Sequence, residues 1–532
     1  MVKGLQIEEL LRKNMAELAR GTEPPVPSRR TFLQLTGLSA ASVTLGIAAP
    51  ATADATPVRP IPDGAFALGV ASGDPRPDGF VLWTRLAPTP LAVDGHGGMP
   101  AGEVPVQWEV AEDSRFRNVV RRGLAIASPD LAHAVHPEVR GLRPGREYFY
   151  RFRVGTQVSP VGRTKTLPTY GEQFTFATAS CQAWYHGYFA AHRDIARRAP
   201  DAVFFLGDYI YEYGIVAGDN LWRAGVTVGP EHGVEIETLE QYRLRYSLFK
   251  TDPHLQAAHA VAPWFLVWDD HEVQNNYGAA NSLYGVPPEL FVHRRAVAYR
   301  AYYENAPLAL DSLPQGPDGR IYRRYDIGSL ARVHLLDTRQ YRDPLPVDEA
   351  DRVSEQRTIM GKEQETWLYD GLRGSRAPWN IVAGGVVLSA VTDDRTEQWD
   401  GYPANRRRVL EAMGGAGTSV MLTGDIHRHV ASELKLDFAD LASRTVGVEL
   451  VCSSVGSNGD GTDTDAYEKD WLQHPYMKLY NARRGYVHST MTRSELTTEF
   501  VNFPYIQADA NAQPNVVARF RTPVADPRLE AL

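Results

Sequence analysis

From about residue 172 onward, short apolar runs alternate with stretches of helical periodicity. The runs are almost continuously apolar, which is typical of strands buried on both faces of a sheet. This alternation predicts an α/β architecture in which helices cover the sheets. The runs read FTFATA, AVFFLG, WFLVWD, RVHLLD, WNIVAGGVV, VMLTGD and GVELVCSS. A tail with hairpin character, GYVHSTMTRSELTTEFVNF, closes the region.

Residues 65–168 have a different pattern, with short alternating runs separated by Gly, Pro and Asp turns. The segment REYFYRFRVG places Tyr148, Tyr150 and Phe152 on one face, which is the period-two pattern of a strand. Several such strands indicate a small all-β immunoglobulin- or fibronectin-like domain. We therefore expect a β-sandwich at 65–168 and a larger catalytic domain at 172–525.

Composition excludes some classes of function. The chain of 532 residues has a net charge of −8, so nucleic acid is not expected as a structural partner. No stretch has both the length and the apolarity of a permanent membrane span. Only two cysteines occur, Cys181 and Cys452, and one disulfide would add little to so large a chain. A chemical role for cysteine is therefore weighed before a structural one.

The N-terminal segment has the order of an export signal. Arg29 and Arg30 precede a mildly apolar stretch that ends in small residues, LSAASVTLGIAAPATADA. This order is typical of a signal peptide, and the arginine pair predicts the twin-arginine route. We assign residues 1–53 to the signal, with cleavage after Ala53 or Ala55. A secreted protein that uses the twin-arginine export machinery is expected.

Chemically competent side chains follow five of the predicted strands. They are Cys181, Asp208, the run from Asp269 to Glu272, Asp337 with Arg339, and Asp425 with His427. Ligands gather at the carboxyl ends of strands in open α/β sheets. A single Asp after a strand is more often a turn or N-cap residue. Five such strand ends together predict one shared site for metal or phosphate.

The donor types favour metal-assisted phosphoryl chemistry. Two-metal sites hold their metals about 3.5–4 Å apart and need a bridging carboxylate, which Asp208 after Gly207 is placed to supply. Asp425 and His427 are spaced to reach one cluster from a tight loop. A Cys thiolate or a Tyr phenolate adds an anionic donor. Such a ligand set suits a redox-capable transition metal, particularly ferric iron, better than a site built only of carboxylate oxygens would.

The ordered motifs SCQ, GDYIY, WDDHEVQNNY, LDTRQYRD and LTGDIHRH resemble those of the PhoD-type alkaline phosphatase family, within the calcineurin-like metallophosphoesterases. The resemblance covers nearly all of the chain after the signal. It implies a metallophosphoesterase αββα sandwich preceded by the small β domain. It also implies a site that holds Fe³⁺ and Ca²⁺. Relatives in this family include phosphodiesterases named as phospholipase D.

The resemblance also implies roles for individual residues. Cys181 resembles the family's iron-ligating cysteine, and Asp208 resembles the carboxylate that bridges the metals. Tyr211 resembles the ferric phenolate ligand. Asp425 and His427 resemble the calcium and iron ligands of the closing motif.

The segment WDDHEVQNN leaves alternatives open. By alignment with the Asn-His-Glu of related phosphoesterases, Asp270 binds the second metal, and Asp269 does so if the register shifts by one. His271 is expected to contact phosphate or to assist the leaving group. Glu272 is expected to orient its neighbours. Asn275 is assigned to substrate binding, with metal ligation or loop formation as the alternatives.

Three further features complete the expected site. Arg339 is assigned to bidentate phosphate binding, with a salt bridge to Asp337 or Asp343 as the alternative. Tyr209 and Tyr213 are interpreted as packing residues. In related enzymes the strand equivalent to WNIVAGGVV often ends in a polar residue near the metals, whereas Gly384 and Gly385 stand there in this chain.

We therefore expect a secreted, monomeric phosphoester hydrolase in which hydroxide generated at the metals attacks phosphorus in line. Its substrates would be phosphoester small molecules or polymers, as monoesters, diesters or both. The first alternative is a phosphodiesterase or phospholipase D that acts on phospholipid or teichoic-acid-type diesters. The second, from another class, is a cell-surface binding protein with a degenerate metal site.

Overall fold

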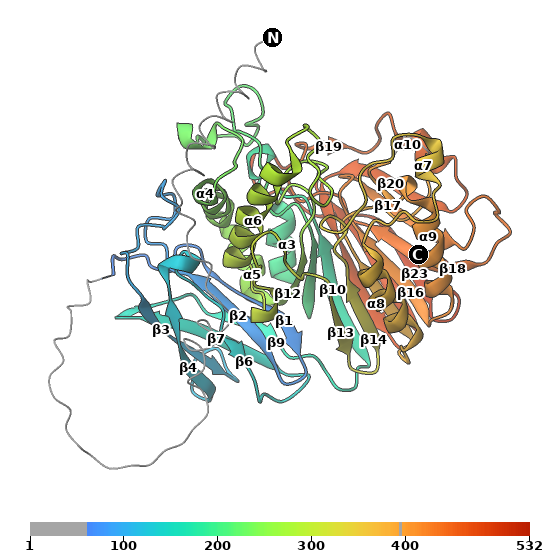
Figure 1. Ribbon diagram of the computed structural model, residues 1–532. Coiled ribbons are helices and arrows are strands. Elements are labelled where there is room, and N and C mark those ends of the chain that lie inside the picture. Colours follow the sequence, from blue (N-terminus) through green and yellow to red (C-terminus); the bar gives the residue numbers. More distant parts are fainter. Residues whose placement is uncertain (1–60, 393–395) are drawn as a thin grey trace, which may run out of the picture. The chain divides into compact units, whose positions relative to one another are not determined.

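The computed structural model describes residues 61–392 and 396–532, which form three sheets and the helices around them (Figure 1). The export signal predicted for residues 1–53 lies outside the described residues. Among the described helices, none combines the length and the apolarity needed to cross a membrane.

The largest sheet contains eleven strands. In spatial order they are β24 (Glu530–Ala531), β23 (Asn515–Pro523), β22 (Glu495–Asn502), β21 (Gly485–Thr492), β10 (Gln173–Ala179), β11 (Ala202–Leu206), β12 (Pro263–Val267), β1 (Val70–Arg76), β2 (Gly79–Arg85) and β5 (Ala134–Val135), with β6 (Glu138–Val139) also beside β2. Strands β10, β11 and β12 are parallel neighbours, so their carboxyl ends lie at one edge. The antiparallel pair β21–β22 confirms the predicted tail hairpin.

The second sheet contains eight strands. In spatial order they are β13 (Arg323–Ile327), β14 (Ala331–Leu335), β15 (Trp379–Ala383), β16 (Thr418–Thr423), β18 (Thr445–Val451), β17 (His429–Lys435), β20 (Met477–Arg483) and β19 (Gly461–Thr462). Strands β14, β15, β16 and β18 are parallel neighbours. Each apolar run singled out in the sequence therefore forms a strand of one of the two large sheets.

The two large sheets pack against each other, and helices cover their outer faces. Phe204 and Phe265 of the first sheet share one core cluster with Ile381 of the second. On the opposite face of the second sheet, Val382 and Met421 pack against α8 and α9. Figure 1 shows α3 to α6 on the outer side of the first sheet, which completes the predicted αββα order. The helices are α3 (Ala190–Arg198), α4 (Leu239–Lys250), α5 (Pro253–Val261), α6 (Pro288–Asn305), α7 (Glu349–Arg352), α8 (Lys362–Arg373), α9 (Pro403–Gly414) and α10 (Glu468–Leu472).

Local sequence signals set the helix ends. Helix α4 begins with a capping box, in which Thr238 Oγ1 accepts from the Gln241 backbone N–H and the Gln241 side chain accepts from the Thr238 backbone N–H. Helix α5 begins at Pro253 after Asp252, whose carboxylate accepts backbone N–H groups of the first turn. Helix α6 ends shortly before Pro307, as its sequence predicts.

The N-terminal region contributes a third, five-stranded sheet. Its strands are β4 (Val119–Ala127), β3 (Val104–Ala111), β7 (Glu147–Val154) and β8 (Gln157–Val158), with β9 (Gly162–Lys165) also beside β7. Val106 and Tyr150 of this sheet share a core cluster with Val70 and Leu82 of β1 and β2. Since β1 pairs in parallel with β12, the facing layer is the edge of the largest sheet. The domain boundary near residue 168 stays a prediction.

Candidate metal centre

The chemically competent strand ends meet where the two large sheets come together. Cys181 follows β10, Asp208 follows β11, and Asp425 follows β16. An isolated parallel bridge between Ser180 and Ser454 joins the end of β10 to the segment after β18. The carboxyl ends of both sheets therefore face one site, as the sequence pattern predicts.

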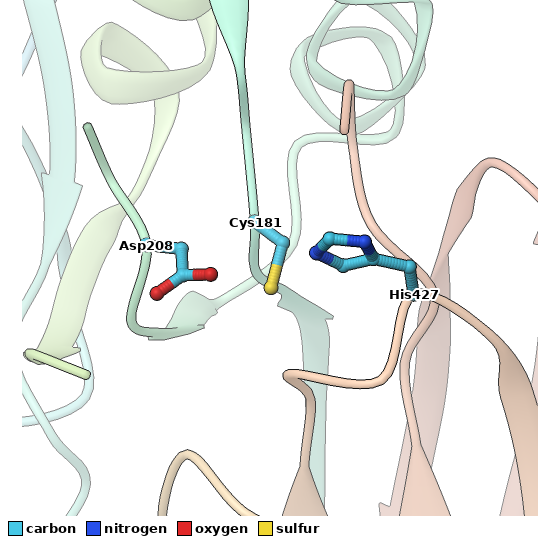
Figure 2. A group of neighbouring side chains, drawn as sticks. All are labelled: Cys181, Asp208 and His427. Atoms are coloured by element: carbon cyan, nitrogen blue, oxygen red, sulfur yellow. The ribbon is translucent and has the colours of Figure 1, made fainter. Parts of the chain in front are cut away.

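Four of the predicted metal ligands lie together in what we call the cysteine cluster: Cys181, Asp208, Tyr211 and His427. Donor atoms of Cys181, Asp208 and His427 all lie within 4.8 Å of one another, and Figure 2 shows the three side chains converging from separate segments. The Tyr211 hydroxyl donates to Asp208 Oδ2 at 2.9 Å and lies 3.1 Å from His427 Nε2. The cluster offers one sulfur, one nitrogen and two kinds of oxygen donor.

A second group, the carboxylate cluster, consists of Asp269, Asp270 and Asp425. Their donor atoms also lie within 4.8 Å of one another. Both aspartates of the WDDHE segment reach this cluster, so the two register alternatives converge on the same place. Asp208, Asp270 and His271 form a further group within 4.8 Å that connects the two clusters. Asp208 belongs to both neighbourhoods, which is the placement that a bridging carboxylate requires.

The backbone at the site adopts a conformation that side chains rarely accept. Cys181, Asp208, Asp425 and His427 have φ of 58°, 56°, 63° and 58°, in the left-handed region. This region costs a non-glycine residue roughly 1–2 kcal/mol. Asp and His tolerate it better than most residues, but Cys does not share that tolerance. Such strain collects at functional sites and persists only where the surroundings hold it.

Glu272 holds two of these segments in place. Its fully buried carboxylate accepts the backbone N–H groups of Asp208 at 3.0 Å, Tyr209 at 2.5 Å and Asp269 at 2.7 Å. One side chain therefore fixes the turns after β11 and β12 together. Glu272 contacts the backbone of the donor residues, as expected for a residue that orients its neighbours.

The residues of the cysteine cluster fit a cation that displaces protons. Burial and the nearby Asp208 charge raise the pKa of the Cys181 thiol and of the Tyr211 phenol well above their ordinary values. Burial and the charge of Arg484 lower the pKa of His427, so its imidazole is neutral. A metal ligand must be a thiolate, a phenolate or a neutral imidazole. Only a cation at this place makes the thiol and phenol favourable as anions.

Orphaned carboxylate oxygens support the same fit. Asp208 Oδ1 and Asp270 Oδ1 are buried and have no hydrogen-bond partner among the described residues. A buried polar group without a hydrogen-bond partner destabilises the fold by about 1–3 kcal/mol, and the cost is larger for a charged group that is neither protonated nor paired. Asp270 Oδ1 is partly offset by Arg339 Nη2 at 3.4 Å, whereas no ion pair among the described residues reaches Asp208, so Asp208 Oδ1 is the oxygen that most needs a bound cation.

Arg339 lies beneath the carboxylate cluster rather than at an open surface. Its guanidinium is fully buried, with Nε 2.5 Å from Asp269 Oδ1 and Nη2 3.4 Å from Asp270 Oδ1, and it also pairs with Glu397. Although burial lowers the pKa of Arg339, these carboxylates raise it well above its ordinary value. The predicted partner Asp337 instead accepts backbone N–H groups in a turn, including that of Arg339 at 3.0 Å. The phosphate-binding role of Arg339 stays a prediction, and its guanidinium already has four acidic partners, since Asp425 Oδ1 also lies 3.5 Å from Nη2.

Gly385, the second glycine after β15, leaves room for the carboxylate cluster. A Cβ atom at Gly385 would lie 2.5 Å from Asp269 Cγ, so the Asp269 side chain occupies the space that a side chain there would need. Gln398 donates to Asp425 Oδ2 at 2.6 Å, and Glu397 pairs with Arg339. Sequence reasoning missed Glu397 and Gln398, because no strand precedes them and no motif contains them.

A pocket of about 320 Å³ opens over both clusters. It is lined by Asp208, Asp270, His271, Asn275, Asn276, Glu397, Gln398, Asp425, Ile426, His427 and Arg428. Asn275, predicted to bind substrate, is therefore at the pocket wall. The Asn276 backbone N–H donates to Asp270 Oδ2 at 2.7 Å, which gives this residue a part in shaping the loop.

His271 is oriented by a buried glutamate that the sequence reasoning missed. Glu212 Oε2 lies 2.7 Å from His271 Nδ1, and Glu212 Oε1 accepts the Asn275 backbone N–H at 2.7 Å. Although burial lowers the pKa of His271, the charges of Glu212, Asp270 and Asp208 raise it well above its ordinary value. In the metal-free site these charges favour the imidazolium form of His271. The sequence reasoning missed Glu212 because attention went to the tyrosines around it, above all the adjacent Tyr211.

Asn458 is a further residue that no pattern in the sequence identified. Its amide nitrogen Nδ2 lies 3.0 Å from His427 Nδ1, opposite the Nε2 atom that faces Tyr211. Because a ligating imidazole donates its other N–H, this amide fixes the ring when its oxygen faces Nδ1.

Tyr209 points away from both clusters, with its hydroxyl 2.8 Å from His259 Nε2 and 3.0 Å from Lys250 Nζ. That arrangement agrees with a packing role for Tyr209.

Comparison with known proteins gives the family. The PhoD-like phosphatase model matches residues 176–500, and the PhoD-like phosphatase N-terminal domain model matches residues 51–168. Alkaline phosphatase D of Bacillus subtilis (strain 168) is 44% identical over 502 residues, which cover 90% of this chain and 85% of the relative. A solved structure described as "Structure of PhoD" matches with a TM-score of 0.82 and 42% identity, covering 88% of this chain and 92% of the other. The chain therefore belongs to the PhoD-like phosphatase family.

Proposed function

We propose that this phosphatase is an exported hydrolase of phosphoesters whose two adjoining donor clusters hold different metals. The observation that carries the proposal is the placement of Asp208 between a cluster with sulfur and nitrogen donors and a cluster of carboxylates. A substrate phosphoryl group in the pocket above would contact both metals. The alternative of a binding protein with a degenerate site is disfavoured, because the predicted donors are all present and adjacent.

The donor chemistry favours Fe³⁺ in the cysteine cluster and Ca²⁺ in the carboxylate cluster. Thiolate, phenolate and imidazole suit a transition metal, whereas Ca²⁺ prefers oxygen ligands. When bound, the two cations would neutralise the phosphoryl charge and lower the pKa of a water molecule at the site. Cys181, Tyr211 and His427 would hold the first metal. Asp270, Asp425 and Asp269 would hold the second.

The protein's own side chains supply the proton for the leaving group and hold the metal-binding carboxylates in place. His271 lines the pocket, so it is placed to donate a proton from Nε2 to the leaving oxygen of the ester. Glu212 holds Nδ1 and so fixes which nitrogen faces the substrate. Glu272 keeps Asp208 and Asp269 in their turns. Gln398 orients the Asp425 carboxylate.

Export by the twin-arginine route is the second part of the proposal. It rests on Arg29, Arg30 and the small-residue segment that follows them. Proteins on this route are exported folded, so the strained turns of the site can form around their metals before export. A fusion of residues 1–60 to a reporter should be exported, and replacement of both arginines by lysine should keep the reporter in the cell. Export of the double variant at the original level would contradict this route.

One assay tests the enzymatic proposal and its diester alternative together. The purified protein is assayed with 4-nitrophenyl phosphate and with bis(4-nitrophenyl) phosphate, and its iron and calcium are measured. We expect hydrolysis of at least one ester, with both metals present and activity lost on chelation. A higher kcat/KM for the bis-ester would select the phosphodiesterase alternative. Full activity after removal of both metals would contradict the proposal.

A further inference from the structure

Arg428 is the one arginine among the residues that line the described pocket. Arg339, in contrast, is fully buried and is surrounded by Asp269, Asp270 and Glu397. Arg428 directly follows His427, and its side chain is 23% exposed. An arginine that is to touch substrate must reach the pocket, and Arg428 meets that condition where Arg339 does not.

The guanidinium of Arg428 is held by a fixed set of neighbours. Asp465 Oδ2 lies 2.8 Å from Nε and 2.7 Å from Nη2. Nε is also 2.8 Å from the Tyr480 hydroxyl, and Nη1 donates to the Ile426 carbonyl at 2.5 Å. The guanidinium carbon lies 4.9 Å from the centre of the Tyr467 ring. The side chain therefore loses little freedom when a ligand binds.

Two N–H donors of Arg428 remain for a ligand. A guanidinium carries five N–H groups, and the contacts with Asp465, Tyr480 and Ile426 use one on each nitrogen. The side edge, formed by Nε and Nη2, faces Asp465. One N–H group on Nη1 and one on Nη2 remain. These two groups can donate to two oxygens of a phosphoryl group or both to one oxygen.

Charge in the pocket makes a held arginine useful. Asp208, Asp270, Glu397 and Asp425 line the same pocket and repel an anion wherever a metal does not offset them. Arg428 directly follows His427 and lines the same pocket, so its positive charge acts on the same space. A second positive group beside the metals would offset the remaining repulsion.

We propose that Arg428, oriented by Asp465 and Tyr480, binds a non-bridging oxygen of the substrate phosphoryl group and of product phosphate. The ligand class is a phosphate monoanion or dianion, or the phosphoryl group of a diester. The proposal rests on the phosphatase function for its substrate. Binding of inorganic phosphate does not require turnover, so the proposal is tested without relying on hydrolysis.

The test compares two arginines that make the same kind of ion pair with two aspartates of one loop, Asp463 and Asp465. Arg483 pairs with Asp463 through Nε at 2.7 Å, as Arg428 pairs with Asp465, but Arg483 does not line the pocket. We measure phosphate affinity by calorimetry on metal-loaded wild type, Arg428→Ala and Arg483→Ala, with metal content determined for each. We expect Arg428→Ala to raise the Kd of phosphate about ten- to a hundredfold, the usual range for a charged hydrogen bond, and Arg483→Ala to change it less than about twofold.

The other outcomes decide against the proposal. An unchanged Kd in Arg428→Ala with full metal content would overturn it, and so would an equal rise in both variants, which would reflect loosening of the loop. If Arg428→Ala fails to fold or loses its metals, Arg428→Lys replaces it, because lysine keeps the charge without the fork. A smaller but measurable rise of Kd in Arg428→Lys supports the proposal. An unchanged Kd, or a failure to fold, in Arg428→Lys would assign Arg428 to the fold and overturn the proposal.

Discussion

The cysteine cluster and the carboxylate cluster are adjacent, because Asp208 of the first lies next to Asp270 of the second. They differ in how their negative charge is balanced. Among the described residues, no ion pair reaches Asp208, and the thiol of Cys181 and the phenol of Tyr211 are kept protonated by burial. The carboxylate cluster holds its own cation, because Arg339 contacts Asp269, Asp270 and Asp425. The cysteine cluster therefore needs a bound metal to balance its charge, whereas Arg339 already balances part of the charge of the carboxylate cluster.

This difference assigns separate dependencies to the two clusters. Burial raises the pKa of Asp269 to about 6 even though Arg339 opposes the rise, whereas Arg339 and His271 overcome burial and lower the pKa of Asp270. The carboxylate cluster can therefore be partly ionised in the metal-free protein. The cysteine cluster gains its anions only with a metal. The metals should accordingly be lost and replaced independently.

The largest effect is expected from removal of the sulfur donor. Cys181→Ala takes away a ligand that only the cysteine cluster uses, and the loss of a metal worth several kcal/mol lowers kcat by roughly a thousandfold. Far-ultraviolet circular dichroism should stay unchanged. Cys452→Ala is the matched control, since Cys452 is equally buried and lies 3.4 Å from Ser180 Oγ, outside both clusters. Comparable activity of the two variants would show that sulfur does not hold the metal.

Replacement of Arg339 tests the charge balance of the other cluster. Arg339→Met leaves buried carboxylates without their cation, which should destabilise the metal-free protein by about 3–5 kcal/mol. Urea denaturation of the chelated protein measures this loss. Millimolar calcium should recover part of it, because a bound cation takes over the same carboxylates. A loss that calcium does not reduce would argue against a cation site at Asp269, Asp270 and Asp425.

The two tyrosines beside the site separate ligation from packing. Tyr211→Phe removes the phenol oxygen that reaches Asp208 and His427, and should lower kcat by about a hundredfold, at the upper end for residues next to a metal. It should also remove the visible absorption that a ferric phenolate gives. Tyr213 contacts His271 only through its ring, at 5.3 Å between centroids. Tyr213→Phe should therefore keep the colour, and its loss there would contradict the assignment of Tyr211.

The smallest effect is expected at Asn458. Asn458→Ala frees Nδ1 of His427 without touching a donor atom, and should weaken metal binding or activity by about tenfold. Asn458→Asp places an acceptor beside Nδ1 in either orientation of the side chain and should restore most of the iron affinity. Chelator competition for iron measures both variants. Equal iron affinity of Asn458→Ala and wild type would remove Asn458 from the site.

The sequence predicted what depends on strand ends and missed what depends on distant chain segments. Cys181, Asp208 and Asp425 follow apolar runs directly. Parallel pairing of β10 with β11 brings Cys181 and Asp208 to one edge, and the packing of the second sheet against the first brings Asp425, at the end of β16, to the same place. Glu212, Glu397 and Asn458 lie in irregular segments whose path is set by tertiary packing, which has no periodic signal.

The role expected of Arg339 shows a second limit. The spacing in DTRQYRD placed Arg339 near the site, but spacing does not say whether a guanidinium faces the pocket or the carboxylates beneath it. Likewise, the left-handed backbone at Cys181 and His427 has no sequence signature, because these residues adopt it under constraints from elsewhere, such as the segment that contains Ser457 and Asn458. Residue type and order identified the donors, and burial decided their partners.

Metal analysis of paired variants tests the central claim, that the clusters hold two different metals independently. Iron and calcium are measured per chain in wild type, Cys181→Ala and Asp269→Asn. The account predicts that Cys181→Ala loses iron and its visible colour but keeps calcium, and that Asp269→Asn loses calcium but keeps iron. A single kind of metal in the wild type, or loss of both metals in both variants, would contradict it.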